Sequence, residues 1–509
     1  MRYWMGVSIL GLLLSNPCFA AFTPPSSPTY CPWPAWKLPD RNPGDAIVYT
    51  DPNGVGYTKP QMDSLYDQVC WQQDPPDTGS KDTWATNQVL AKNGAPARYS
   101  YGPNQFEGLD VYKTSINPAS APTMIFIHGG AWRGGSSSSY GYFAENFVNA
   151  GANLIVLDFI NVIQSNGDLL AMGSQVRDAV AWVYQNAGTL QINPNNIYVS
   201  GHSSGGHLCG VAITTDWPAR GLPADVIKGA VCASGMYDLT PVALSARNTY
   251  VNFTPQTVSE LSPAQHIGNI HARVVLGHGT KETPEFQRQS ELFAVQLRAA
   301  GKPVALVVAP GYNHFEFAET FANPYGPMGR ASLELMGLST TSSLKWGTPG
   351  TRDAVEYFDS ALGEYFLTTD PGEVALLDTS VVTGWTRTSQ SFNVYPDASS
   401  GGSPVCRFFS TAASKKSSHL YTADANQCAA AKADANWQYE GIAFYIGVPD
   451  GAGNCRAGTV PVFGLHNGAA GATLSHRYTT NANVRSQMTA AGWVPEGSGT
   501  LGVVMCSPT

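Results

Sequence analysis

The stretch IYVSGHSSGGHL, residues 197–208, decides the fold of the N-terminal part of the chain. It starts with a short apolar run that predicts a buried strand, passes through a turn of small residues and opens a segment that predicts a helix. Ser203 lies at the apex of this turn. Glycines at positions 201 and 205 suit a strained backbone that leaves no room for side chains beside the serine. The helix that follows would direct its positive end at the serine oxygen.

A second turn of small residues lies upstream. The run MIFI, residues 124–127, predicts another buried strand, and it ends in HGGAWRGG, residues 128–135. Small residues are required where a reacting oxygen must approach backbone N–H groups closely. We therefore predict an oxyanion hole formed by the N–H groups of Gly130, Ala131 and Ser204, with Gly129 as the less favoured donor.

A serine hydroxyl becomes a strong nucleophile only when a histidine accepts its proton and a carboxylate orients that histidine. With this kind of turn the order along the chain is serine, acid, histidine. His314 lies in the loop that follows the predicted strand at residues 304–308, and Glu282 lies in the loop that follows the predicted strand at residues 273–277. The predicted triad is Ser203, Glu282 and His314.

Three other carboxylates compete with Glu282. Glu285 falls in the first turn of a predicted helix that runs to Ala300, where the helix dipole explains a negative charge. Glu316 lies two residues from His314 and would point to the opposite side of the local chain. Asp238 follows an earlier predicted strand and stays open as an alternative acid, as does Glu285.

Four sequence blocks, in this order, resemble the α/β-hydrolase esterases related to arylformamidase (kynurenine formamidase) and to bacterial feruloyl-esterase-type domains. The blocks are HGGAW (128–132), GHSSGGHL (201–208), ETPEFQRQS (282–290) and NHF (313–315). The resemblance covers residues 85–338 and implies Ser203 as nucleophile, Glu282 as acid and His314 as base. Relatives commonly carry Asp-Tyr-Arg after the strand at residues 154–157, whereas this chain has Asp158-Phe159-Ile160, so we expect a different pocket wall.

Apolar strands that alternate with helical patterns predict a mostly parallel sheet covered on both faces. The predicted fold class is α/β, an α/β-hydrolase fold, followed by a C-terminal β-rich module of three repeats. The predicted core strands are residues 124–127, 154–157, 197–200, 227–233, 273–277 and 304–308.

The N-terminus predicts export. Arg2 precedes the apolar run at residues 9–14, and small residues allow cleavage after Ala20. This run is too short to span a bilayer, and no other segment predicts a membrane span. We expect a signal peptide at residues 1–20 and secretion to the periplasm or the extracellular space.

The eight remaining cysteines form an even set, which indicates disulfides in an oxidising compartment. No C-x-x-C pair or zinc-type histidine spacing occurs, so no metal or other cofactor is expected. A net charge of −8 without basic runs disfavours nucleic-acid partners. Grouping along the chain predicts Cys31 with Cys70, Cys209 with Cys232, and two bridges among Cys406, Cys428, Cys455 and Cys506.

Residues 21–84, rich in proline, tryptophan and turn residues, predict an irregular extension tied by Cys31 and Cys70. The tryptophans of this extension are expected to pack it down, and shaping a cleft is the alternative. Trp132, Trp217 and Tyr140 are candidate pocket-lining residues in the hydrolase part. The four tryptophans of the extension are Trp33, Trp36, Trp71 and Trp84.

Composition changes after residue 338. Residues 339–351 predict a linker, and residues 352–509 contain three related motifs, each followed by a tryptophan. The motifs are EYFLTT (364–369), HLYTAD (419–424) and HRYTTN (476–481). They predict a β-rich module with pseudo-threefold organisation, similar to repeat modules of unknown function on secreted bacterial hydrolases and adhesins. The recurring aromatic residues suit a repeated core, and binding of carbohydrate or a polymer surface at exposed rims stays open.

The sequence therefore predicts a secreted serine hydrolase that cleaves carboxylic esters through an acyl-enzyme. The expected substrates are aromatic esters, feruloyl esters or polyesters, including polymeric ones. One alternative is an arylformamidase-like hydrolase of amides or formamides. The other is a non-catalytic protein that binds a surface.

Overall fold

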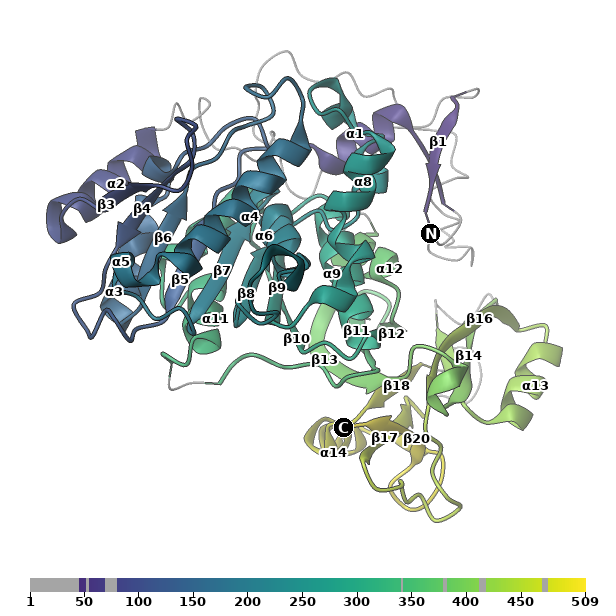
Figure 1. Ribbon diagram of the computed structural model, residues 1–509. Coiled ribbons are helices and arrows are strands. Elements are labelled where there is room, and N and C mark those ends of the chain that lie inside the picture. Colours follow the sequence, from purple (N-terminus) through teal and green to yellow (C-terminus); the bar gives the residue numbers. More distant parts are fainter. Residues whose placement is uncertain are drawn as a thin grey trace. The chain divides into compact units, whose positions relative to one another are not determined.

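The computed structural model describes residues 45–51, 55–68, 80–339, 342–378, 382–411, 418–468 and 475–509. The described chain divides into two compact units, one ending at Trp346 and the other beginning at Gly347 (Figure 1). Within these residues no helix combines the length and the apolar character that a membrane span needs. The predicted signal peptide, the pair Cys31 and Cys70, and three of the four extension tryptophans lie outside the described residues.

The N-terminal unit is built on an eight-stranded sheet with the order β10-β9-β8-β7-β5-β6-β4-β3. Strands β5 to β10 pair in parallel, while β3 and β4 add an antiparallel edge. All six predicted core strands are present, so the predicted α/β fold class is confirmed. The bounds are β3 Ala97–Ser100, β4 Gly108–Tyr112, β5 Thr123–Ile127, β6 Asn153–Leu157, β7 Ile197–His202, β8 Gly229–Ala233, β9 Arg273–Gly279 and β10 Val304–Ala309.

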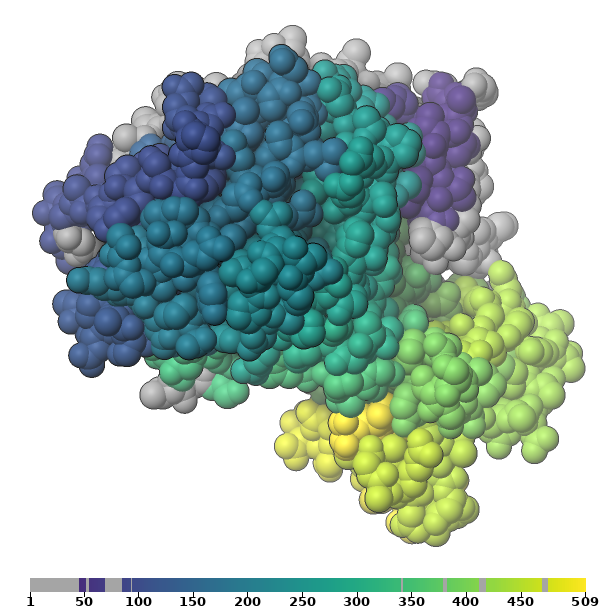
Figure 2. Space-filling model, viewed as in Figure 1, coloured from purple at the N-terminus to yellow at the C-terminus, as the bar shows by residue number. Residues whose placement is uncertain are grey.

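Helices cover both faces of this sheet because its central strands bury both sets of side chains. In β5, Ile125 and Ile127 join one apolar cluster with helices α4, α6, α8 and α9. Met124 and Phe126 join a second cluster with α3, α10 and α11 on the other face. Figure 2 shows one face, where side chains of α4, α6 and α9 close over the sheet. The helix bounds are α3 Ala144–Ala150, α4 Leu169–Gln185, α5 Ala187–Leu190, α6 Ser204–Ile213, α7 Leu239–Val242, α8 Pro255–Leu261, α9 Pro284–Ala299, α10 His314–Glu319 and α11 Pro327–Leu335.

The described part of the extension is more regular than the sequence predicts. Strands β1 (Ile47–Thr50) and β2 (Gly56–Thr58) form an antiparallel hairpin, followed by helices α1 (Lys59–Tyr66) and α2 (Ser80–Asn93). Thr58 and Gln61 form a capping box at the start of α1, a local signal that the proline and turn content obscured. Helix α1 buries Met62, Leu65 and Tyr66 in the same cluster as α9. The described part of the extension therefore contributes to the core of the N-terminal unit, and the expected boundary at residue 84 falls inside α2.

The C-terminal unit repeats one pattern three times: a long strand, a short strand, a helix and a return strand. Asp370, Asp424 and Asn481 accept hydrogen bonds from backbone N–H groups at the start of the three helices. These residue types are typical helix caps, yet the three helices were not predicted from the sequence. The cysteines pair as Cys406 with Cys428 and Cys455 with Cys506. The bounds are β11 Arg352–Asp359, β12 Glu364–Thr368, α12 Pro371–Asp378 and β13 Trp385–Val394; β14 Ser403–Ser410, β15 His419–Thr422, α13 Ala425–Ala433 and β16 Trp437–Ile446; β17 Thr459–His466, β18 His476–Thr479, α14 Ala482–Ala490, β19 Val494–Glu496 and β20 Val503–Pro508.

The recurring tyrosines lie at the centre of this unit. Tyr421 and Tyr478 are buried in one cluster with apolar residues of all three copies. The Tyr421 hydroxyl donates to the Leu367 carbonyl at 2.6 Å and accepts from the Leu367 N–H at 3.1 Å. The Tyr478 hydroxyl accepts from the Tyr421 N–H at 3.1 Å. Each tyrosine therefore joins its own copy to the backbone of the preceding copy.

We expect Tyr421→Phe to destabilise the C-terminal unit by about 1–3 kcal/mol, because it leaves two buried backbone groups of Leu367 without a partner. The measurement is calorimetric unfolding of the whole protein, with Tyr439→Phe as the control. Tyr439 is 40% exposed and lies in the second copy as well. Equal shifts in melting temperature for the two variants would contradict the central role of Tyr421.

Candidate active site

Ser203 occupies a strained turn between β7 and α6. Its φ of 59° and ψ of −124° lie outside the regions that residues with a Cβ ordinarily adopt. A Cβ on Gly205 would overlap the carbonyl oxygen of Ile127, and one on Gly201 would overlap the carbonyl oxygen of Gly205. Both positions flanking the serine therefore require glycine, as the sequence pattern predicts.

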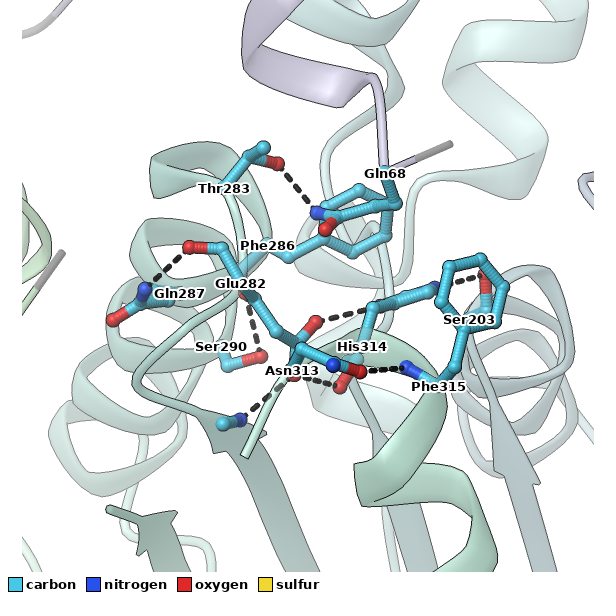
Figure 3. A network of polar contacts seen from close by, with 12 residues as sticks. Gln68, Ser203, Glu282, Thr283, Phe286, Gln287, Ser290, Asn313, His314 and Phe315 are labelled. Atoms are coloured by element: carbon cyan, nitrogen blue, oxygen red, sulfur yellow. Dashed lines mark hydrogen bonds and ion pairs between the residues drawn. The ribbon is translucent and has the colours of Figure 1, made fainter. Parts of the chain in front are cut away.

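His314, the first residue of α10, lies between Ser203 and Glu282 (Figure 3). Its Nε2 is 2.9 Å from Ser203 Oγ, and its Nδ1 is 2.6 Å from Glu282 Oε2. The three side chains come from the ends of β7, β9 and β10, which meet at the carboxyl edge of the parallel sheet. All three residues are buried, Glu282 completely. The structure thus brings together the three residues of the predicted triad.

Glu282 is held in place by partners that the sequence analysis missed. Its Oε1 accepts from Ser234 Oγ and from the Gly279 N–H, both at 2.7 Å. Gln287 Nε2 donates to the backbone carbonyl of Glu282 at 2.7 Å. One carboxylate oxygen is thereby fixed by the protein, and the other faces His314. Ser234 follows β8 in sequence, and no local pattern distinguishes it from other loop serines.

The competing carboxylates have other partners. Glu285 accepts from Tyr66 Oη at 2.7 Å and pairs with Arg288; burial raises the pKa of Glu285, but this pair and its hydrogen bonds bring it below the ordinary value. Asp238 caps α7 through the Thr240 N–H at 2.9 Å. Glu316 accepts from the Asn313 N–H at 3.1 Å, within a capping box. These contacts give each of the three a structural role.

The turn after β5 lies directly beside Ser203. A Cβ on Gly129 would be 2.9 Å from the His202 carbonyl oxygen and 3.3 Å from Ser203 Cβ. Gly130 and Ala131 have φ values of 114° and 55°, and within the described residues their N–H groups have no hydrogen-bond acceptor. Ser204 is the first residue of α6, where an N–H lacks an acceptor inside the helix. Among the described residues, none of these three N–H groups has an acceptor within the protein.

Aromatic side chains surround the His314 ring. The Phe286 ring lies 4.6 Å away and the Phe315 ring 5.6 Å away, measured between centroids. Trp132 and Trp217, which the sequence analysis placed in the pocket lining, are only 1% and 2% exposed and belong to the core. Their indole N–H groups donate to His207 Nδ1 and to the Ala212 carbonyl, respectively.

The third candidate lining residue, Tyr140, is half-buried and packs against Phe126 and Phe143. The described rings that contact the His314 ring are instead those of His202, at 4.4 Å, Phe286 and Phe315. Phe315 directly follows His314 and Phe286 lies four residues after Glu282, and that proximity in the sequence is the signal that could have identified the two phenylalanines.

Three buried histidines near the site are held in the neutral form. Burial lowers the pKa of His128, of His202 and of His207, the last to about 4. In His207, Nδ1 accepts from Trp132 Nε1 at 3.1 Å, and Nε2 donates to the Leu261 carbonyl at 2.8 Å. A proton on His207 Nδ1 would face the indole N–H of Trp132 and break this hydrogen bond. Trp132 directly follows Ala131 in the sequence. Among the described residues, no group of three or more His, Cys, Asp or Glu side chains is arranged to hold a metal ion.

Residues 109–297 match the family model BD-FAE, and residues 355–503 match the model described as Domain of unknown function (DUF5648). The chain is 29% identical over 244 residues to the kynurenine formamidase of Danio rerio, across 47% of this chain and 81% of that protein. It is 27% identical over 237 residues to the esterase LipC of Mycobacterium tuberculosis, across 43% of this chain and 59% of that protein. A solved esterase from Pyrobaculum calidifontis has a TM-score of 0.41 and 18% identity, across 52% of this chain and 93% of that chain.

The buried histidines predict loss of stability in acid. Between pH 6.5 and about 4 the unfolded chain binds a proton at His207 and the folded chain does not, so the free energy of unfolding falls as the pH falls through this window. The expected loss from His207 alone is about 2–3 kcal/mol at pH 4. Denaturant titrations from pH 7 to pH 4.5 measure it.

His207→Gln is expected to weaken this pH dependence, although it also lowers stability at neutral pH. The exposed His271 provides the matched control, because His271→Gln is expected to keep the wild-type slope. A His207→Gln slope identical to that of the wild type would contradict the assignment.

Proposed function

We propose that this protein, whose N-terminal unit belongs to the α/β-hydrolase esterase family, cleaves carboxylic esters through an acyl-enzyme on Ser203. The observation that carries the proposal is the double hydrogen bond of His314, to Ser203 Oγ on one side and to Glu282 Oε2 on the other. A histidine held in this way can take the serine proton and return it to a leaving group.

The first half of the reaction forms the acyl-enzyme. Ser203 Oγ attacks the ester carbonyl carbon while its proton passes to His314 Nε2. The carbonyl oxygen becomes an oxyanion that accepts hydrogen bonds from the N–H groups of Gly130, Ala131 and Ser204. The tetrahedral intermediate then breaks the bond to the alcohol oxygen, and His314 gives its proton to that oxygen.

Water completes the cycle. His314 Nε2 removes a proton from a water molecule that attacks the acyl carbon, and the proton then returns to Ser203 Oγ as the carboxylic acid departs. Throughout, Glu282 keeps the Nδ1 proton of His314 in place and stabilises the imidazolium. The hydrogen bonds from Ser234 and Gly279 to Glu282 support this orientation.

A formamide hydrolase is the second candidate. The similarity to the kynurenine formamidase of Danio rerio, across 81% of that protein, favours it. The same groups would act on a formamide, with His314 protonating an amine instead of an alcohol. Comparison of kcat/KM for N-formylkynurenine and for phenyl acetate decides between the two activities.

We propose that the protein acts outside the cytoplasm on an aromatic, feruloyl or polymeric ester. Support comes from the N-terminal signal pattern and from the cysteine pairs of the described residues, which are Cys209–Cys232, Cys406–Cys428 and Cys455–Cys506. Contact with a carbohydrate or polymer surface through the C-terminal unit is part of this proposal.

Ser203→Ala is expected to lower kcat on a short 4-nitrophenyl ester by a factor of about 10⁴ or more, because the nucleophile is lost. Initial rates on this ester, methyl ferulate, a polyester oligomer and N-formylkynurenine measure the effect and rank the substrates. A fluorophosphonate probe should label the wild type and not the variant. If the wild type is inert and unlabelled, the non-catalytic alternative replaces this proposal.

Glu282→Gln is expected to reduce kcat by a factor of about 10³–10⁴ with little change in KM, because the amide cannot stabilise the imidazolium. Glu316→Gln is the control, since Glu316 lies two residues from His314 but bonds to the Asn313 N–H. A larger loss in Glu316→Gln than in Glu282→Gln would reverse the assignment of the acid.

A further inference from the structure

An arginine lies beside the aromatic rings of the candidate site. Arg247 belongs to the short helix η6 (Ala246–Thr249). Its guanidinium carbon is 5.5 Å from the centre of the Trp132 ring and 5.9 Å from the centre of the Phe286 ring. Trp132 directly follows Ala131, and Phe286 packs on His314 at 4.6 Å. One aromatic ring thus separates Arg247 from the catalytic histidine.

The charge of Arg247 is not neutralised within the described residues. Its Nη1 donates to Tyr250 Oη at 3.0 Å and its Nη2 to the Tyr66 carbonyl at 3.3 Å. Its Nε is buried and has no partner, and no described carboxylate forms an ion pair with the guanidinium. Arg288 differs, because the buried carboxylate of Glu285 pairs with it.

A second cation, Arg133, also contacts Tyr250. The guanidinium carbon of Arg133 is 4.9 Å from the centre of the Tyr250 ring. Arg133 is exposed, follows Trp132 in the turn after β5, and forms no ion pair with a described carboxylate. One positive charge, Arg133, therefore belongs to the turn that supplies two of the candidate oxyanion N–H groups, and a second, Arg247, lies against Trp132 of the same turn.

Each terminal nitrogen of the Arg247 guanidinium carries two N–H groups and uses one of them in the described contacts, so the edge formed by Nη1 and Nη2 keeps two N–H groups without a described acceptor. These N–H groups lie in the guanidinium plane, and this edge matches the two oxygens of a carboxylate. Aromatic contact stabilises the cation but does not neutralise it. An anion that reaches this edge would gain a charge-assisted interaction with the half-buried guanidinium.

We infer that the substrate carries a carboxylate, on the acyl or the alcohol side of the scissile bond, and that Arg247 binds it with the support of Arg133. The inference rests on the proposed ester hydrolysis and adds the charge of the substrate to it. Arg247 is then a specificity-determining residue. The competing role is structural: Arg247 would only hold the Tyr66 carbonyl and η6 in place.

Two matched pairs of esters separate these roles. On the acyl side the pair is 4-nitrophenyl hydrogen glutarate and 4-nitrophenyl pentanoate; on the alcohol side it is 4-acetoxybenzoate and 4-methylphenyl acetate. Within each pair a methyl group replaces the carboxylate. Comparing each variant with the wild type on the same ester cancels the chemical differences between esters.

Arg247→Gln is expected to lower kcat/KM for the anionic member of at least one pair by about 10–100-fold, chiefly through KM. The neutral member should change by less than about threefold, and Arg247→Lys should retain part of the preference. Arg273→Gln is the matched control. Arg273 also stacks on an indole, that of Trp346 at 4.0 Å, but lies at the amino end of β9, away from the catalytic edge. It is expected to leave both rates unchanged.

Equal losses for the anionic and neutral members of both pairs in Arg247→Gln would overturn the inference and leave the structural role. Ester cleavage that depends on Ser203 but shows no charge preference would overturn the inference alone and keep the proposed function.

A binding measurement tests the inference even if the protein turns over none of these esters. Calorimetric titration of the Ser203→Ala protein with benzoate should give a dissociation constant that rises about tenfold or more when Arg247→Gln is added. Benzyl alcohol, the neutral comparison ligand, should not respond to that substitution. If benzoate does not bind, or binds equally well with and without Arg247, the carboxylate site does not exist.

Discussion

The contact between the backbones at the carboxyl ends of β5 and β7 is the constraint on which the site depends. The carbonyl oxygens of Ile127 and His128 lie where a side chain of residue 205 would have to be, and Gly129 lies against Ser203. Parallel strands that end at one edge bring the two turns together, and only residues without a Cβ allow that spacing. The serine, the candidate oxyanion donors and the start of α6 take their positions from this contact.

The acid and the base are added from two further strands of the same sheet. Glu282 and His314 follow β9 and β10, which lie beyond β8 at the edge of the sheet. A triad assembled in this way needs no contact between neighbours in the sequence: His314 lies 111 positions after Ser203. Its geometry is instead fixed by hydrogen bonds from Ser234 and Gly279, and by the rings of Phe286 and Phe315.

These relationships explain what the sequence could and could not predict. The core strands and the residues that meet at His314 could be predicted, because strand periodicity and glycine requirements leave local traces. The roles of Ser234, Gln287 and Arg247 could not be predicted, because they arise from tertiary packing. No sequence pattern near these residues indicates that packing. Capping residues at the start of α1 and of the three repeat helices could have predicted these helices. The proline and glycine content of the same segments favoured an irregular or β-rich prediction instead.

In the C-terminal unit the repeats are bound into a closed set. Arg407 of the second copy pairs with Glu373 of the first, and Arg477 of the third copy pairs with Glu356 of the first. The last copy is therefore joined to the first by a nearly buried ion pair as well as by the shared apolar centre. Tandem repeats in a sequence can also form an open array in which each copy contacts only its neighbours. The contacts between the first and third copies show that these three repeats form a closed arrangement instead.

The contacts of the extension with α9 determine how far the hydrolase can be trimmed. Thr283, adjacent to Glu282, donates to the Leu65 carbonyl at 2.7 Å and accepts from Gln68 Nε2 (Figure 3). Tyr66 donates to Glu285, two residues after Thr283. A fragment limited to residues 85–338 would retain every block of the family resemblance, yet it would expose the side of α9 that carries the acid loop. The smallest fragment that keeps the contacts of this loop therefore begins before α1. That start lies outside residues 85–338, which carry the family resemblance.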